Sequence, residues 1–152
     1  MLVGVISDTH GLLRPEALTA LAGVEHILHA GDVGNADFLD HLREIAPVTA
    51  IRGNIDTFGP CAELSATEAV ELGGRFVYMV HAIDDLDLSP SAAQIDVVVY
   101  GHSHKPSVTQ RDGVLYLNPG SAGPRRFSLP VTVALLHLDA VEVRAEIVQL
   151  ID

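Results

Sequence analysis

The sequence predicts a single α/β domain with mixed β-sheets, and three observations lead to this prediction. The first third of the chain alternates apolar, strand-like runs with helical patterns, which favours parallel strands with helices packed on a sheet. The remainder contains strand-like runs joined by tight-turn dipeptides, which are typical of antiparallel hairpins. With 152 residues, 48% of them hydrophobic, and no repeat or linker, residues 1–152 are expected to form one domain.

The parallel part of the fold is predicted from the boundary signals of its segments. The opening apolar run is typical of a strand that is buried on both faces. Pro15 suits the first position of a helix and Gly23 its end, while Asn35 can cap a second helix. The expected elements, in order, are strand 2–7, helix 15–23, strand 25–29, helix 36–45 and strand 48–51.

Three dipeptides predict the hairpins of the second part: Gly73-Gly74, Asp112-Gly113 and Asp139-Ala140. In the last strand, the alternation of apolar and charged residues from Val141 to Ile147 predicts that one face is exposed to solvent. The expected strands are 70–72 and 75–80, then 95–100, then 108–111 and 114–117, and finally 131–138 and 141–148.

Composition limits the possible functions and locations. Twenty acidic residues against nine basic ones give a net charge of −11, which opposes binding to duplex nucleic acid. A single cysteine, Cys61, permits neither an internal disulfide nor a thiolate zinc site, which favours a reducing compartment. There is no apolar run of membrane-spanning length, so we expect a cytoplasmic protein without membrane partners. Hairpin edges and aliphatic surface would allow a homo-oligomer, although no specific interface is visible.

Polar side chains with metal-binding chemistry follow five of the expected strands. In open α/β sheets, ligands bind beyond the carboxyl ends of the strands, so these clusters are expected to meet at one place. Each cluster alone is also compatible with an ordinary turn or with a buried histidine. The clusters are Asp8-Thr9-His10, Gly31-Asp32, Gly53-Asn54, His81 and Gly101-His102-Ser103-His104.

The combined set of side chains points to two divalent ions. Two carboxylates, one amide oxygen and four imidazoles, without a thiolate, suit Mn, Fe, Co, Ni or Zn. Seven ligands are more than one tetrahedral ion can use. Two ions about 3.5–4 Å apart that share a carboxylate would use all seven, as in two-metal hydrolases.

The order of these motifs resembles the calcineurin-like metallophosphoesterase superfamily, above all its small bacterial and archaeal phosphodiesterase branch, which includes the retromer-subunit fold. The resemblance covers nearly the whole chain and extends to the turn Asn118-Pro119-Gly120-Ser121, followed by Pro124-Arg125. It implies a four-layer αββα sandwich of two mixed sheets flanked by helices.

The resemblance also implies how the seven ligands divide and what they do. One ion would be held by Asp8, His10 and His104, the other by Asn54, His81 and His102, with Asp32 bridging both. The implied activity is metal-dependent hydrolysis of a phosphate ester, with a phosphodiesterase favoured and a metal-bridging hydroxide as the attacking group. Asp32, Asn54 and His81 would act through metal and phosphate positioning. Mn²⁺ is the favoured ion, with Fe, Zn, Ni or Co as alternatives.

The sequence departs from the family pattern at Ile55, where many larger relatives have a histidine that can protonate the departing oxygen. Isoleucine cannot do this, so we expect poor activity on alkyl monoesters and better activity on phosphodiesters with stabilised leaving groups. Asp56 and Asp84 could orient the imidazoles or be solvated loop residues, and Arg125 could contact substrate phosphate or form a salt bridge. The other histidines, His26, His29, His41 and His137, are interpreted as structural or surface residues.

Two other functions stay open at this point. The first is a non-catalytic metal-binding scaffold or interaction module, because the same fold also serves in a membrane-coat assembly. The second is a metal-dependent hydrolase that acts on an amide or a thioester. The intact set of seven ligands favours catalysis over the scaffold, and no obvious acyl pocket supports the second alternative.

Overall fold

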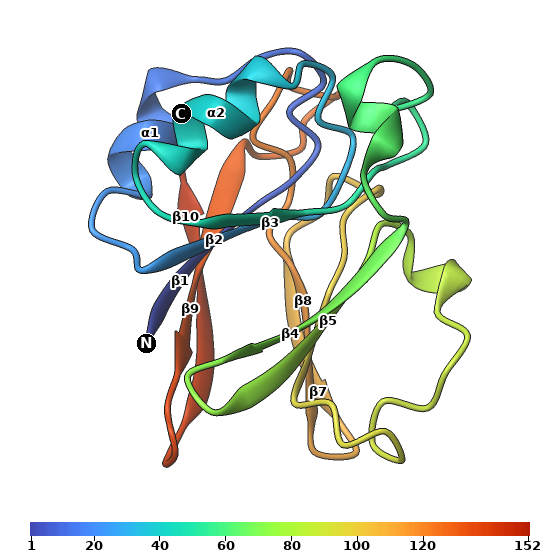
Figure 1. Ribbon diagram of the computed structural model, residues 1–152. Helices are drawn as coiled ribbons and strands as arrows, with labels where there is room; N and C mark the ends of the chain where they lie inside the picture. The colour runs from blue at the N-terminus through green and yellow to red at the C-terminus, as the bar shows by residue number, and fades with distance from the viewer.

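The computed structural model describes residues 1–152, which fold into two facing β-sheets of five strands each (Figure 1). The first sheet has the strand order β10-β9-β1-β2-β3 and the second has the order β4-β5-β6-β8-β7. Both sheets contain parallel and antiparallel neighbours, so the predicted pair of mixed sheets is confirmed.

The first sheet is parallel in its N-terminal part. β1 pairs in parallel with β2, and β2 pairs in parallel with β3, which gives registers such as Val5 opposite Leu28 and Leu28 opposite Thr49. The antiparallel β9 then covers the other edge of β1, and β10 closes the sheet beside it. The strand bounds are β1 Leu2–Ile6, β2 His26–His29, β3 Val48–Ala50, β9 Thr132–Leu138 and β10 Val143–Gln149.

The second sheet consists of two hairpins on either side of a central strand. The β4–β5 and β7–β8 pairs are antiparallel and turn at Gly73-Gly74 and Asp112-Gly113, as predicted. The central strand β6 runs parallel to both β5 and β8. The bounds are β4 Thr67–Leu72, β5 Arg75–Val80, β6 Val97–Val99, β7 Ser107–Arg111 and β8 Val114–Asn118.

Most of the hydrophobic core lies between the sheets, where fifteen buried residues from both inner faces pack together. A second cluster of twelve lies between the first sheet and the helices α1 (Pro15–Ala20) and α2 (Asp37–Arg43). A side chain at Gly4 in β1 would lie 2.5 Å from Leu21 Cδ2, so this glycine lets the end of α1 approach the sheet closely.

The outer face of the second sheet has a lighter cover. Val98 and Tyr116 on that face pack against Ile83, Leu86 and Ile95 from the segment that links β5 to β6. This segment contains a single 3-10 turn, η2 (Ile83–Asp85), and another short turn, η1 (Pro60–Glu63), precedes β4. The fourth layer of the expected sandwich is therefore a loop with a 3-10 turn, whereas both α-helices cover the first sheet.

The predicted start of the last strand is wrong at Val141. Asp139 Oδ1 accepts hydrogen bonds from the amides of Val141 (2.8 Å) and Glu142 (2.7 Å), so residues 139–142 form a turn. Val141 is 92% exposed there, and β10 begins only at Val143. From Val143 onward, the charged residues of the alternation, Arg144 and Glu146, are exposed as predicted.

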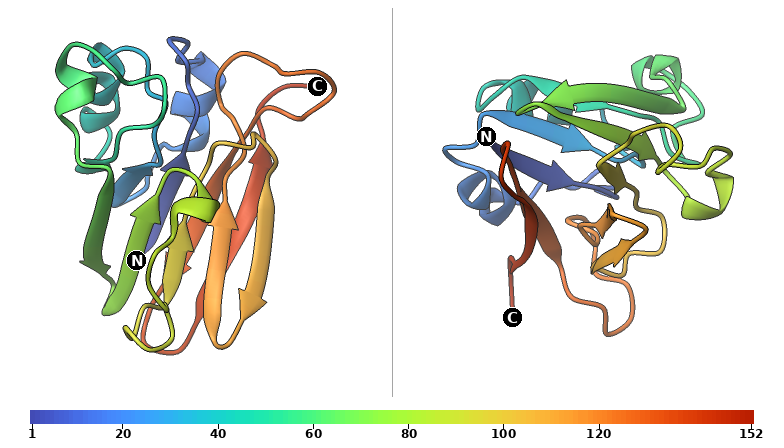
Figure 2. Two further views of the ribbon diagram at one scale, coloured as in Figure 1. Left: turned by 90° about the vertical axis from the view of Figure 1, so that its right-hand side faces the viewer. Right: turned by 90° about the horizontal axis from the view of Figure 1, so that it is seen from below.

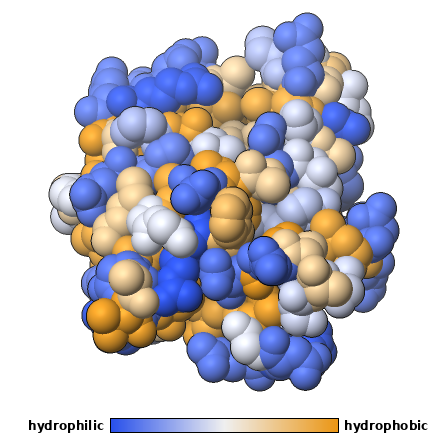
Figure 3. Space-filling view, turned by 60° about the horizontal axis from the view of Figure 1, so that its bottom comes forward, coloured by the Kyte–Doolittle hydropathy of each residue, from blue (hydrophilic) through white to orange (hydrophobic).

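The parallel strands place their carboxyl ends at one end of the sandwich. In the left view of Figure 2, β1 and β5 point toward the same end of the molecule, where the loops after them gather. The opposite end, which Figure 3 brings forward, has hydrophobic and hydrophilic residues interspersed on its surface. None of the helices is long and apolar enough to cross a membrane.

Candidate metal centre

The structure brings the seven predicted ligand residues together where the ends of the two sheets meet. The loop after β1 pairs with the loop after β2 through hydrogen bonds from the Asp8 amide to Gly31 O and from the His10 amide to Asp32 O. The second sheet joins them because the His102 amide donates to Asp8 Oδ2 at 3.1 Å. Side chains from positions 8 to 104 therefore share one site.

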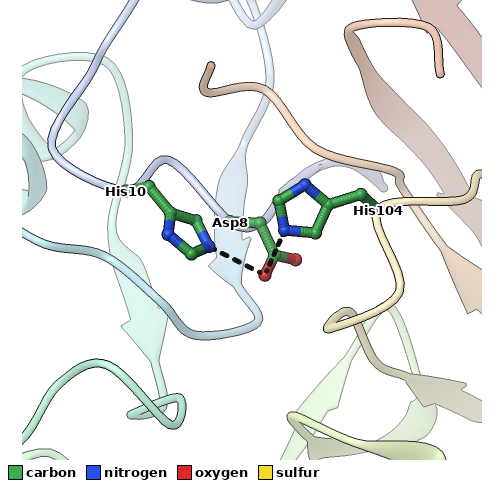
Figure 4. Close-up of side chains that lie close together, drawn as sticks. All are labelled: Asp8, His10 and His104. Atoms are coloured by element: carbon green, nitrogen blue, oxygen red, sulfur yellow. Dashed lines mark ion pairs between the residues drawn. The ribbon is translucent and has the colours of Figure 1, made fainter. Parts of the chain in front are cut away.

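The first group of side chains surrounds Asp8 Oδ1 (Figure 4). His10 Nε2 lies 3.6 Å from this oxygen and His104 Nε2 lies 3.5 Å from it. Asp8 is fully buried, and its other oxygen, Oδ2, accepts a hydrogen bond from the Ser7 hydroxyl. Asp8 Oδ1 and His10 Nε2 are buried without a hydrogen-bond partner, so both are free to bind a cation.

The second group consists of Asp32, His81 and again Asp8, whose Oδ1 lies 3.8 Å from His81 Nε2. Asp32 Oδ2 lies 3.1 Å from His10 Nε2 on one side and 3.3 Å from His81 Nε2 on the other. The end of the Asn54 amide group lies 3.1 Å from His81 Nε2 and 3.2 Å from His102 Nδ1. Asp32 Oδ2 therefore lies between the imidazoles of His10 and His81.

The tautomer of His81 suits a metal ligand. His81 Nδ1 lies 2.6 Å from the carbonyl oxygen of Ala30, which can only accept a hydrogen bond, so Nδ1 carries a proton. In the neutral ring, Nε2 is then the basic nitrogen, and it faces Asp32 and Asn54. Carboxylate, amide and imidazole donors that point inward, with no thiolate among them, fit borderline divalent cations.

Charge at the site affects several pKa values. Burial disfavours the charged form of Asp32, but the adjacent His81 side chain and the amide of Ile55 outweigh it and lower the pKa of Asp32 to about 2. The Asp8 carboxylate raises the pKa of His10. Burial lowers the pKa of His104, and the positive charge of Arg126 acts in the same direction. Asp32 is thus ionised at neutral pH and ready to bind a cation.

The backbone at the site is unusual. Eight residues other than glycine have a positive φ, and five of them are predicted ligands: Asp8, His10, Asp32, His102 and His104, with φ between 47° and 72°. A left-handed conformation of this kind costs a non-glycine residue roughly 1–3 kcal/mol and persists only where the surrounding structure imposes it. Folding therefore fixes the directions of these five side chains.

The glycines of the motifs leave space for the ligands of other loops. A side chain at Gly31 would lie 2.6 Å from His81 Nδ1, and one at Gly53 would lie 2.1 Å from Asp32 Oδ1. At Gly101, it would lie 2.2 Å from Ser7 Oγ and 2.6 Å from Asp8 Oδ2. Because Gly53 and Gly101 have no positive φ, these two glycines are required for the close approach of neighbouring atoms and not for a left-handed backbone.

The turn Asn118-Pro119-Gly120-Ser121 stabilises the loops of the centre through hydrogen bonds. Asn118 Nδ2 donates to the Gly101 carbonyl and to the Ser103 hydroxyl, both at 3.1 Å. Ser121 Oγ donates to the carbonyl of Asp8 at 2.9 Å. The turn therefore holds the loops of His102 and Asp8 in place.

Asp56 has a role that the sequence did not reveal. It is buried, and its carboxylate accepts hydrogen bonds from the amides of Val33 (3.1 Å), Gly34 (3.1 Å) and Gly53 (2.8 Å). Asp56 thus ties the β2 and β3 loops together through their backbones and orients no imidazole. Asp84 is exposed, in agreement with a solvated loop residue.

Comparison with known proteins gives consistent matches over the whole fold. The calcineurin-like phosphoesterase superfamily domain matches residues 1–141. A probable metallophosphoesterase of Methanothermobacter thermautotrophicus is 36% identical, covering 98% of this chain and 92% of its own length. The phosphodiesterase YfcE of Escherichia coli K12 is 29% identical over 91% of this chain and 89% of its own.

Solved structures share the same architecture. A novel archaeal phosphodiesterase superimposes with a TM-score of 0.80 at 25% identity, covering 97% of this chain and all of its own. The zinc complex of Vps29 from Entamoeba histolytica superimposes with a TM-score of 0.75, covering 99% of this chain and all of its own. The Vps29 match is 23% identical and shows the fold alone.

Proposed function

The chain belongs to the calcineurin-like phosphoesterase superfamily, and on this basis we propose that it is a phosphodiesterase with a centre for two divalent cations. Its relatives support metal-dependent phosphoester hydrolysis as the general activity. The position of Asp32 Oδ2 between His10 Nε2 and His81 Nε2 carries the more specific proposal, because one carboxylate can there serve two ions.

The seven side chains would hold the ions as two sets that share Asp32. Asp8, His10 and His104 would form one set, supported by their mutual proximity, and Asn54, His81 and His102 would form the other, supported by the position of Asn54 beside both imidazoles. Two divalent cations, when bound, lower the pKa of water to near neutrality and neutralise charge on phosphoryl oxygens. Mn²⁺ is the ion we would test first, since carboxylate and amide oxygens suit it, and Fe, Zn and Ni, which imidazole suits, come next.

The residues of the chain would position the metal ligands, and none of them is needed as the nucleophile. The Ala30 carbonyl fixes the His81 ring, and the Ile55 amide donates to Asp32 Oδ1 at 3.0 Å, so two ligands are held by the backbone. The Ile55 side chain cannot donate a proton to the departing oxygen. The best substrates would therefore be phosphodiesters whose alcohols leave as stable anions, such as aryl esters.

The test is hydrolysis of bis(p-nitrophenyl) phosphate with and without Mn²⁺, in the wild type and in Asp32→Asn. We expect Mn²⁺-dependent turnover that falls at least about 100-fold in Asp32→Asn, together with a loss of bound metal from two ions to one or none. Asp112→Asn is the matched control, because Asp112 has nearly the same φ (54° against 55°) in an exposed turn. Turnover that needs no metal would contradict the proposal.

A second candidate is a non-catalytic metal-binding module, favoured by the fold that the chain shares with the Vps29 structures. The same experiment separates the two functions. Two bound ions without turnover of any aryl diester would favour the module. Turnover that depends on both Mn²⁺ and Asp32 would favour the phosphodiesterase.

A further inference from the structure

A small pocket borders the candidate metal centre on the side of His10. It has a volume of about 170 Å³ and is lined by His10, His104, Pro124, Arg125 and Arg126. Pockets that enclose a whole small molecule usually measure about 300–1,000 Å³. This pocket, called the Arg126 pocket below, therefore has room for one group of a substrate that is already bound at the metal centre.

Arg126 is one of only two cationic side chains that have no partner in the structure. The other is Lys105. The remaining seven of the nine make a hydrogen bond, an ion pair or a cation–π contact: Arg14, Arg43, Arg52, Arg75, Arg111, Arg125 and Arg144. In a chain with twenty acidic residues, an arginine without an acidic partner beside a catalytic centre has a charge that is available to a ligand.

The two unpartnered cations have different surroundings. No carboxylate lines the Arg126 pocket. Lys105 lies in a pocket that also contains Asp84. Asp84 and Asp85 line the adjoining pocket on the His102 side, where the guanidinium of Arg52 donates to the Leu64 carbonyl. An anionic group is therefore favoured on the His10 side of the centre and opposed by acidic residues on the other side.

The loop that carries Arg126 is fixed on both sides of it. The Arg14 guanidinium donates to the Gly123 carbonyl (Nη2 at 3.2 Å), and the Leu129 amide donates to the Arg126 carbonyl at 3.1 Å. The neighbouring Arg125 also lines the pocket, but its guanidinium already donates to the carbonyl of Asp152. Of the two arginines in this loop, Arg126 is thus the one whose guanidinium is free to contact a substrate, whereas Arg125, for which the sequence left substrate contact and a salt bridge open, bonds to the backbone.

We infer that the Arg126 pocket binds a second anionic group of the substrate, a carboxylate or a phosphate carried by one of its alcohols, while the metal centre holds the scissile phosphate. A guanidinium presents paired N–H donors that match the two oxygens of such a group. The inference rests on the proposed phosphodiesterase function and narrows its substrate class to phosphodiesters with an additional negative charge.

The test compares two aryl diesters that differ by one carboxylate: phenyl p-nitrophenyl phosphate and 3-carboxyphenyl p-nitrophenyl phosphate. We expect the wild type to have a KM about threefold to tenfold lower for the carboxylated diester. Arg126→Ala should abolish this preference, so that the ratio of the two KM values falls to about one. Arg144→Ala, which removes an exposed positive charge from β10, should keep the preference.

Binding without turnover provides a second readout. Calorimetry of the Mn²⁺-loaded protein with phenylphosphonate and 3-carboxyphenylphosphonate should show the same preference in the wild type and its loss in Arg126→Ala. Equal affinity of the wild type for both phosphonates would overturn the inference, even if both diesters are hydrolysed. If neither diester is hydrolysed but the binding preference is present, the anion site stands and the proposed phosphodiesterase activity fails.

Discussion

His29 Nε2 lies 3.1 Å from Thr9 Oγ1, in the buried space between the loops that follow β1 and β2. The Gly31 amide donates to His29 Nδ1, so the proton of the neutral ring is on Nε2 and is donated to Thr9. The Thr9 hydroxyl in turn donates to the Val33 carbonyl at 2.7 Å. These three hydrogen bonds join the loop of Asp8 and His10 to the loop of Asp32.

This arrangement predicts an acid-sensitive contribution to stability. Burial lowers the pKa of His29 to about 4, below the ordinary value of 6.5, so the folded state keeps the ring neutral while the unfolded state takes up a proton. Stability is then lost as the pH falls below about 6.5, by about 2 kcal/mol at pH 5 and about 3 kcal/mol below pH 4.

The measurement is urea unfolding at pH 7.5 and pH 5 with EDTA, for the wild type and for His29→Gln. The stability advantage of the wild type over the variant should shrink by about 2 kcal/mol between these pH values. Because the same ligand histidines titrate in both proteins, their contribution cancels in the difference. A parallel loss of stability in both proteins would show that His29 is not the group responsible.

Gly101→Ala should weaken metal binding for a purely steric reason. The new methyl group would meet Ser7 Oγ and Asp8 Oδ2, and because Gly101 has no positive φ, the backbone itself can accept alanine. We expect the affinity for Mn²⁺ to fall at least about tenfold, measured by calorimetry.

Gly74→Ala is the control for Gly101→Ala. Gly74 has a φ of 79° in the β4–β5 turn and no heavy atom near the position of an added Cβ. Its substitution should lower the free energy of unfolding by roughly 1 kcal/mol without changing the affinity for Mn²⁺. If both variants bind Mn²⁺ as the wild type does, the close approach at Gly101 has no role in the site.

Asp56→Asn should destabilise the fold far more than Asp84→Asn, although both are aspartates in loops near the site. The substitution leaves the Val33, Gly34 and Gly53 amides with a weaker acceptor in a buried position. We expect a loss of about 2–4 kcal/mol in the free energy of unfolding, against less than about 0.5 kcal/mol for the exposed Asp84. Urea unfolding of the two variants would reveal equal losses if the Asp56 contacts were unimportant.

Ile55 predicts a strong dependence of rate on the leaving group. For a series of aryl and alkyl diesters, kcat should fall steeply as the pKa of the departing alcohol rises, because no side chain at position 55 can protonate it. Ile55→His should raise kcat for the poorest leaving groups by at least about tenfold and flatten the plot. Ile55→Val is the control and should keep the steep slope, whereas a shallow slope in the wild type would point to another proton donor.

The sequence predicted those parts of the site that depend on the type of each residue and on the order of the motifs along the chain. Strand ends could be located from apolar runs and glycines, and the topological rule for parallel strands then placed Asp8, Asp32 and Asn54 at one end. The same strand-end argument also included His81, His102 and His104, and the family resemblance then divided the seven ligands into two sets. The structure places all of these side chains near one another, as expected.

The parts that could not be predicted depend on contacts between distant loops. Asp56 looks like a solvated loop residue in the sequence, because its three amide partners are 3 to 23 positions away. His29 lies at the end of a strand with no signal that separates a buried ring from an exposed one. Val141 follows the alternation of a strand, but its amide donates to the Asp139 side chain and so lies in a turn. The local sequence pattern does not show whether a backbone amide will bond to a nearby side chain or to a neighbouring strand.

The centre is assembled from loops of both layers of the sandwich: Asp8 and Asp32 follow strands of the first sheet, and His81 and His104 follow strands of the second. A pair of cations bound there would link the two sheets at the end opposite the hairpin turns. Shear of one layer against the other would alter the spacing of the ions and, with it, their fit to a phosphorus centre. Mutations in the core between the sheets would then change the turnover rate even where they are too mild to unfold the protein.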